Sequence, residues 1–195
     1  MADILDNYRQ MLARVNDLCQ GIEGTLKNHI SCSEGCSSCC KIITLFPVEA
    51  AYLNTALESL PADQAEVILH YVEQHPSGDN CPLLQDNRCL LYAARPVICR
   101  THGLPILYLE NSEKWVDCCP RNFVQCHSLP GTAIIDLERL NSLLVAVNAH
   151  FLSQFNLPED FPERLTITEA VSGLGYARKF CDNDYPANLD ISKPI

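Results

Sequence analysis

Apolar residues recur at spacings of three and four along the first segment of the chain. This periodicity predicts a long amphipathic helix over residues 3–28. The apolar stripe consists of Ile4, Tyr8, Met11, Leu12, Val15, Leu18, Cys19, Ile22 and Leu26. Because Cys19 belongs to this stripe, we expect its thiol to pack as a small buried hydrophobe rather than to bind a ligand.

Prolines and acidic residues mark the helices that follow. Pro47 and Glu49 suit the first turn of a helix, so we predict a helix that extends from about residue 44 to residue 60. Pro61 ends that helix and can open the next one, which we expect to reach about His75. The Pro-Ser-Gly-Asp-Asn run over 76–80 predicts a turn.

Helical periodicity returns from residue 132 onward. Asp136 and Glu138 fall in the first turns, where acidic side chains interact favourably with the helix dipole. The expected apolar face consists of Ile135, Leu137, Leu140, Leu143, Leu144, Val147, Phe151 and Leu152. We expect a further helix over residues 162–179 and a surface-bound or frayed tail after Asp182.

Two stretches lack periodicity. Residues 31–41 are rich in Ser, Gly and Cys, which predicts a loop. Residues 81–130 hold many cysteines and prolines, and we expect only a helical turn near 91–95 and a small β-hairpin, with strands at 106–109 and 114–116. The predicted fold is therefore mainly α: a single helical domain over residues 1–195 with an irregular cysteine-rich insert.

Composition and charge narrow the class of protein. A chain of 195 residues with 47% hydrophobic and 19% charged residues suits a globular domain with a sizeable core. The formal net charge of −10 disfavours nucleic-acid binding, which usually needs a basic face. The chain has neither a basic start followed by an apolar run nor a long apolar stretch. We therefore expect a cytoplasmic protein without a membrane interaction.

Cysteine is the residue type that points to chemistry. Ten of the 12 cysteines lie between Cys32 and Cys126. Thiolates are soft ligands for zinc, copper(I) and iron–sulfur clusters, and reducing compartments favour such ligands over a disulfide framework, which is the alternative. The candidate metal ligands are Cys32, Cys36, Cys39, Cys40, Cys81, Cys89, Cys99, Cys118, Cys119 and Cys126.

Spacing organises the first part of this set. Cys36 and Cys39 are separated by two residues, so one tight turn can direct both sulfurs to one ion, and Gly35 suits such a turn. Cys39 and Cys40 are adjacent and must project differently. Either this pair serves two centres, or one member lies outside the ligand shell. Ligands at Cys81, Cys89 and Cys99 would couple metal binding to folding.

The order of these motifs resembles the YkgJ-type cysteine-cluster family, of CxxCxxCC type, which comprises small bacterial proteins described as chelators of zinc or iron. The resemblance covers residues 32–150, with a motif core over 32–126. It rests on Cys36-x₂-Cys39-Cys40, Cys81-Pro82-Leu83-Leu84, Cys89-x₂-Tyr92-x₂-Arg95-Pro96-x₂-Cys99-Arg100, Gly103-Leu104-Pro105 and Cys119-Pro120-Arg121-Asn122-Phe123. Cys32 departs from the pattern, because three residues rather than two separate it from Cys36.

The resemblance implies a metal-binding protein without naming the metal. We expect an iron–sulfur cluster or iron, with zinc as the alternative, used for metal handling, structure or electron transfer. Arg95 and Arg100 flank Cys99, and we expect their guanidinium groups to offset the negative charge of the thiolate-bound centre. The protein partner is left open.

Two alternative functions remain. The flagellin lysine methylases carry a similar cysteine pattern, which the resemblance connects to an iron–sulfur cluster, so an enzyme is one alternative. The other is a redox sensor that forms disulfides among Cys118, Cys119 and Cys126.

Overall fold

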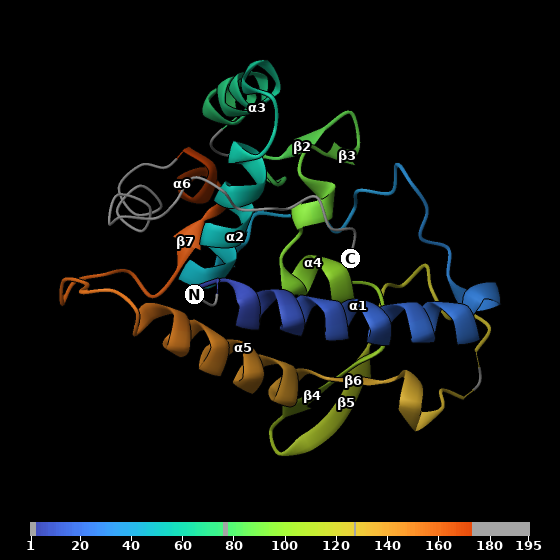
Figure 1. Ribbon diagram of the computed structural model, residues 1–195. Coiled ribbons are helices and arrows are strands. Elements are labelled where there is room, and N and C mark those ends of the chain that lie inside the picture. The colour runs from blue at the N-terminus through green and yellow to red at the C-terminus, as the bar shows by residue number, and fades with distance from the viewer. Residues whose placement is uncertain (1–2, 76–77, 127, 173–195) are drawn as a thin grey trace.

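The computed structural model describes residues 3–75, 78–126 and 128–172. The fold is mostly helical, as predicted (Figure 1). The α-helices are α1 (Asp6–Thr25), α2 (Pro47–Glu58), α3 (Ala62–Gln74), α4 (Val97–Thr101), α5 (Leu137–Leu152) and α6 (Ile167–Ser172). Short 3₁₀ helices are η1 (Lys27–His29), η2 (Tyr92–Ala94) and η3 (Gly131–Ala133). The predicted helical turn near 91–95 is therefore confirmed as η2.

The strands in the described ranges form three small sheets. Strands β1 (Thr44–Leu45) and β7 (Leu165–Thr166) pair antiparallel, as do β2 (Leu84–Gln85) and β3 (Arg88–Cys89). The third sheet has the order β5-β4-β6, where β4 (Ile106–Glu110) pairs antiparallel with β5 (Glu113–Asp117) and parallel with β6 (Ile135–Asp136). The hairpin expected at 106–116 is thus confirmed.

Helix α1 runs through the middle of the molecule, with α4 on one side and α5 on the other (Figure 1). Its predicted stripe supplies much of the core: Tyr8 and Leu12 are fully buried, and Cys19 is buried as expected. Leu18 is the exception, since 40% of it is exposed. That prediction was wrong because Leu18 lies at the margin of the helical stripe.

Three other boundaries differ from the predictions because short strands precede the helices. The helix expected from residue 44 begins at Pro47, after β1, and the helix expected from residue 162 begins at Ile167, after β7. Helix α5 begins at Leu137, where the Asp136 carboxylate accepts a hydrogen bond from the Arg139 N–H at 3.0 Å. The predicted residues after 172, including the tail, lie outside the described ranges.

The predicted apolar face of α5 is only partly correct. Leu140, Leu144 and Phe151 are buried, whereas Leu143 is 52% exposed. A polar residue, Asn148, is buried instead, and its side-chain oxygen accepts a hydrogen bond from the Val48 N–H at 3.1 Å. None of the helices in the described ranges combines the length and apolar character that a membrane crossing requires.

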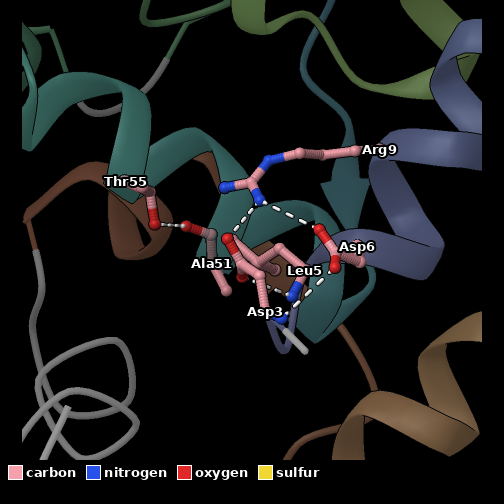
Figure 2. Close-up of polar contacts among 6 residues, drawn as sticks. All are labelled: Asp3, Leu5, Asp6, Arg9, Ala51 and Thr55. Atoms are coloured by element: carbon pink, nitrogen blue, oxygen red, sulfur yellow. Dashed lines mark hydrogen bonds and ion pairs between the residues drawn. The ribbon is translucent and has the colours of Figure 1, made fainter. Parts of the chain in front are cut away.

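Polar contacts stabilise the first turn of α1 (Figure 2). The Asp3 carboxylate accepts a hydrogen bond from the Leu5 N–H at 2.9 Å and pairs with the Arg9 guanidinium, which also lies 3.5 Å from the Asp6 carboxylate. In the neighbouring α2, the Thr55 hydroxyl donates to the Ala51 carbonyl at 2.9 Å. The acidic side chains thus lie at the end of α1 where the helix dipole favours negative charge.

Glu49 joins three helices at the side of the fold that carries Cys99. This residue is only 4% exposed, and its carboxyl group accepts hydrogen bonds from the Phe46 and Val97 N–H groups, both at 3.1 Å. The Tyr8 hydroxyl donates to it at 3.5 Å. Burial raises the pKa of Glu49. Because these bonds link α1 to the first residues of α2 and α4, Glu49 helps to fix the position of α4.

Candidate metal centre

The cysteines in the described ranges are free thiols, so the disulfide alternative finds no support among them. Cys32 and Cys39 are exposed, and the other candidate ligands are half-buried. Their sulfurs fall into groups that the order of the sequence does not show.

An inner group consists of Cys40, Cys81, Cys89 and Cys99. Backbone pairing positions the first three. The Cys81 N–H donates to the Cys40 carbonyl at 2.9 Å, and the neighbouring Lys41 and Asn80 form a β-bridge. Cys89 lies in β3, paired with Leu84 of β2. In Figure 1, the chain after α1 passes toward this hairpin before it reaches α2.

The negative charges that these thiols would carry interact with one another. Burial, together with the smaller effects of the neighbouring Cys81, Cys89 and Cys40, raises the pKa of Cys99 to about 12. Burial likewise raises the pKa of Cys81 to about 11, with contributions from Cys89 and Cys40. The four sulfurs therefore lie near enough for their charges to repel, and without a cation each thiol holds its proton strongly.

Backbone N–H groups and one arginine favour thiolates in this group. Hydrogen bonds from the Leu83 and Leu91 N–H groups lower the pKa values of Cys81 and Cys89, against the larger effect of burial. The positive charge of Arg95 lowers the pKa values of Cys40, Cys89 and Cys99. The Arg95 guanidinium stacks on the Tyr92 ring, 3.5 Å from its centroid.

Arg100 has different surroundings from Arg95. Its guanidinium donates to the Asn16 side-chain oxygen at 2.8 Å and to the carbonyls of Ala93 and Arg95, both at 2.7 Å. These contacts connect α1 to the turn before α4. Arg100 also lowers the pKa of Cys19, although burial of Cys19 has the larger, opposite effect. We expected both arginines to offset the charge of a thiolate-bound centre. That role stays a proposal, and the effect of Arg95 on the pKa values of the cysteines favours it for Arg95.

An outer group consists of Cys32, Cys36, Cys39 and Cys119. It adjoins the inner group, because Cys36 and Cys39 also shift the pKa of Cys40. The Asn122 side-chain N–H₂ donates to the Cys32 sulfur at 3.3 Å, and an Arg121 guanidinium nitrogen lies 3.7 Å from the Cys36 sulfur. Partial burial raises the pKa of Cys32, and the charges of Cys119, Cys36 and Cys39 also raise it. Hydrogen bonds from Ser38 lower the pKa of Cys36, and Arg121 lowers it further.

The remaining candidates lie nearby. Burial raises the pKa of Cys118, with contributions from Asp117, Cys119 and Cys126, so these three thiols are neighbours. The Cys126 thiol donates to the Ser128 carbonyl at 3.2 Å.

Within the ranges that the structure describes, no group of three or more Cys, His, Asp or Glu side chains is arranged to hold a metal ion as it stands. The donors nevertheless suit zinc or iron, because soft thiolates are gathered beside N–H donors and an arginine. When bound, such an ion would supply the positive charge that keeps these thiols ionised. The sulfurs would have to move closer together, so metal binding would also change the local structure.

These features define a helical protein with a multi-cysteine site. Residues 31–123 match the family CxxCxxCC, described as "Putative zinc- or iron-chelating domain". Residues 31–123 thus match the family that the resemblance implied. The match includes both the inner and the outer group but ends before Cys126. Comparisons with curated proteins and with solved structures gave no match.

The sequence alone gave no role to Asn122, Arg121 or Gly103. All three belong to the motifs that carry the family resemblance, and that membership was the sequence feature that could have indicated a role at the site. Their contacts with sulfurs depend on how distant segments meet, so the strings alone do not reveal them.

Proposed function

We propose that this protein is a cytoplasmic metal-binding protein whose main centre is held by Cys40, Cys81, Cys89 and Cys99. The proposal rests on one observation. Three distant segments bring four half-buried thiols near enough for their charges to interact. Such a cluster is unfavourable when ionised alone and favourable around a cation. The family match to zinc- or iron-chelating domains supports the same class of ligand.

An iron–sulfur cluster or iron is our first choice of cofactor, and zinc is the alternative. Four thiolates satisfy either a cluster or a closed zinc site. In both cases Arg95 offsets part of the negative charge, and the N–H groups of Leu83 and Leu91 donate to ligand sulfurs. The centre would serve metal handling, structure or electron transfer.

The test is anaerobic purification followed by elemental analysis and visible spectroscopy. Wild-type protein should contain iron, with absorption typical of a cluster, or colourless bound zinc. The double variant Cys81→Ser/Cys99→Ser should lose the metal of the inner group, whereas the matched control Cys126→Ser should keep it. Folded wild-type protein that takes up neither iron nor zinc when both are supplied would contradict the proposal.

The enzyme and redox-sensor alternatives stay predictions. The proximity of Cys118, Cys119 and Cys126 favours examining the redox sensor first. Mass spectrometry after mild oxidation should show disulfides among these three thiols if that alternative is correct.

A further inference from the structure

A pocket of about 550 Å³ lies between α2, α4 and α5. Buried side chains from all three helices line it: Glu49, Val97, Thr101, Leu140 and Leu144. Pockets of this size, lined mainly by apolar side chains with a few polar groups, are typical binding sites for small molecules. None of the lining residues is a cysteine, so the pocket is distinct from the thiol groups described above.

Exposed apolar side chains also line this pocket. Ile42 is 47% exposed and precedes β1, and Ile98 of α4 is 39% exposed. Covering such apolar surface is favourable, because it removes that surface from water. The lining therefore suits a ligand whose body is apolar.

Arg164 places a positive charge at the pocket. It immediately precedes β7, whose pairing with β1 sets Thr166 opposite Thr44. The Arg164 guanidinium lies over the Phe46 ring, 3.7 Å from its centroid, and donates to the Thr44 carbonyl at 3.5 Å. Phe46 and Thr44 line the pocket as well. Strand pairing and the aromatic ring thus hold this guanidinium beside the apolar lining.

The Arg164 side chain has donors to spare for an anion. Among the residues that the structure describes, no carboxylate forms an ion pair with it. A guanidinium carries several N–H donors in a planar fork, and a carboxylate matches two of them at once. The group that complements Arg164 best is therefore a carboxylate on the ligand.

Glu49 is the acidic residue of the lining, and it does not select a cation. Its carboxyl group is almost fully buried and already accepts hydrogen bonds from the Phe46 and Val97 N–H groups and from the Tyr8 hydroxyl. These donors compensate its charge from within the fold. The exposed charge at the pocket is that of Arg164.

We propose that this pocket binds a small molecule with an apolar body and one carboxylate group. The apolar body lies between α4 and α5, and the carboxylate pairs with Arg164. This site goes beyond the proposed function, because it uses no thiol and no metal. Its ligand contacts α4, the helix that also carries Cys99.

The test is calorimetric titration of the whole chain with hexanoate, decanoate and 4-phenylbutyrate, which offer short, long and aromatic bodies. We expect at least one of them to bind at a single site per chain. The alcohol with the same body should bind about tenfold more weakly, because a hydrogen bond to a charged group is lost, and the amine should bind more weakly still. Absence of binding by all three carboxylates, or an amine that binds as tightly as its carboxylate, would overturn the proposal and leave the metal centre untouched.

A charge variant tests the role of Arg164. Arg164→Gln should weaken binding of the carboxylate about tenfold and leave binding of the alcohol unchanged, since only the charged group is recognised by the guanidinium. The control Arg139→Gln removes an exposed arginine of α5 that does not line the pocket, and it should leave both affinities unchanged. Equal carboxylate affinities for Arg164→Gln and Arg139→Gln would show that Arg164 does not bind the ligand.

A second pair of variants locates the apolar body. Ile42→Glu introduces a charge at the pocket and should weaken binding of both the carboxylate and the alcohol at least about tenfold, because a charged group is costly to bury. Val67→Glu adds the same charge at an apolar position of α3 that is 64% exposed and does not line the pocket, so it should leave both affinities unchanged. Circular dichroism should show wild-type helix content in both variants. Unchanged affinities in Ile42→Glu would place the ligand elsewhere and overturn the proposal.

Discussion

Gly103 shows how a single residue without a side chain determines the arrangement of distant sulfurs. Its φ of +90° is a conformation that other residues rarely adopt, and a Cβ atom there would lie close to Asn122 and Cys32. We expect Gly103→Ala to lower the free energy of unfolding by about 1–3 kcal/mol, because the backbone strain alone has that magnitude. Urea denaturation of the metal-free protein measures the change.

Gly21 provides the control for this prediction. It lies in α1, and a Cβ atom added there would meet nothing within 4 Å. Gly21→Ala should therefore stabilise the protein by roughly 0.5–1 kcal/mol, since alanine favours a helix interior. If both substitutions changed stability in the same direction, the explanation from the conformation of Gly103 would be wrong.

At the scale of elements, tight turns position the two hairpins of the cysteine-rich region. Positive φ values occur in pairs, at Asp86 and Asn87 between β2 and β3 and at Asn111 and Ser112 between β4 and β5. Such pairs are typical of type I′ turns, which match the twist of antiparallel strands. The Asn87 side chain also accepts a hydrogen bond from the Ser37 hydroxyl at 2.7 Å, so the first turn helps to hold the cysteine loop.

The second turn offers a test, because Ser112 has a φ of 67° and serine is strained there. We expect Ser112→Gly to raise the free energy of unfolding by about 0.5–1 kcal/mol, since glycine adopts this conformation without steric cost. Thermal and urea denaturation measure the change. Ser142→Gly in α5 is the matched control and should destabilise the protein by a similar amount. A destabilised Ser112→Gly variant would argue against the type I′ turn.

At the scale of the whole molecule, metal binding is coupled to protons and to stability. The pKa values of Cys81 and Cys99, about 11 and about 12, keep these thiols protonated in the metal-free protein at neutral pH. Each thiol that becomes a ligand must release its proton. We therefore expect zinc affinity to fall as pH is lowered, by up to about tenfold per pH unit for each thiol displaced.

Calorimetric titration with zinc in buffers of different ionisation enthalpy measures the protons released. Binding without proton release near neutral pH would contradict ligation by these thiols. The raised pKa values also mean that the metal-free protein loses stability as pH rises above the ordinary thiol pKa, because ionisation is harder in the folded state than in the unfolded state. Bound metal should remove that loss.

The sequence by itself determined the main helices and the class of ligand. Periodicity located α1 and α5, because a helix depends on residues three and four positions apart, and prolines with acidic residues located α2 and α3. Cysteine spacing indicated thiolate metal binding, since that preference belongs to the sulfur atom. The resemblance identified the family whose model matches residues 31–123.

Only the tertiary structure decided what depends on distant segments. Because β1 pairs with β7 and β4 pairs with β6, the helices that follow these strands begin later than predicted. Such strand partners cannot be recognised from local periodicity. The same reason applies to the sulfurs. Packing brings Cys40 to Cys81, and it brings Cys32 to Cys119 beside Asn122. Side-chain type determined that metal could bind, and the folded chain decided which thiols meet.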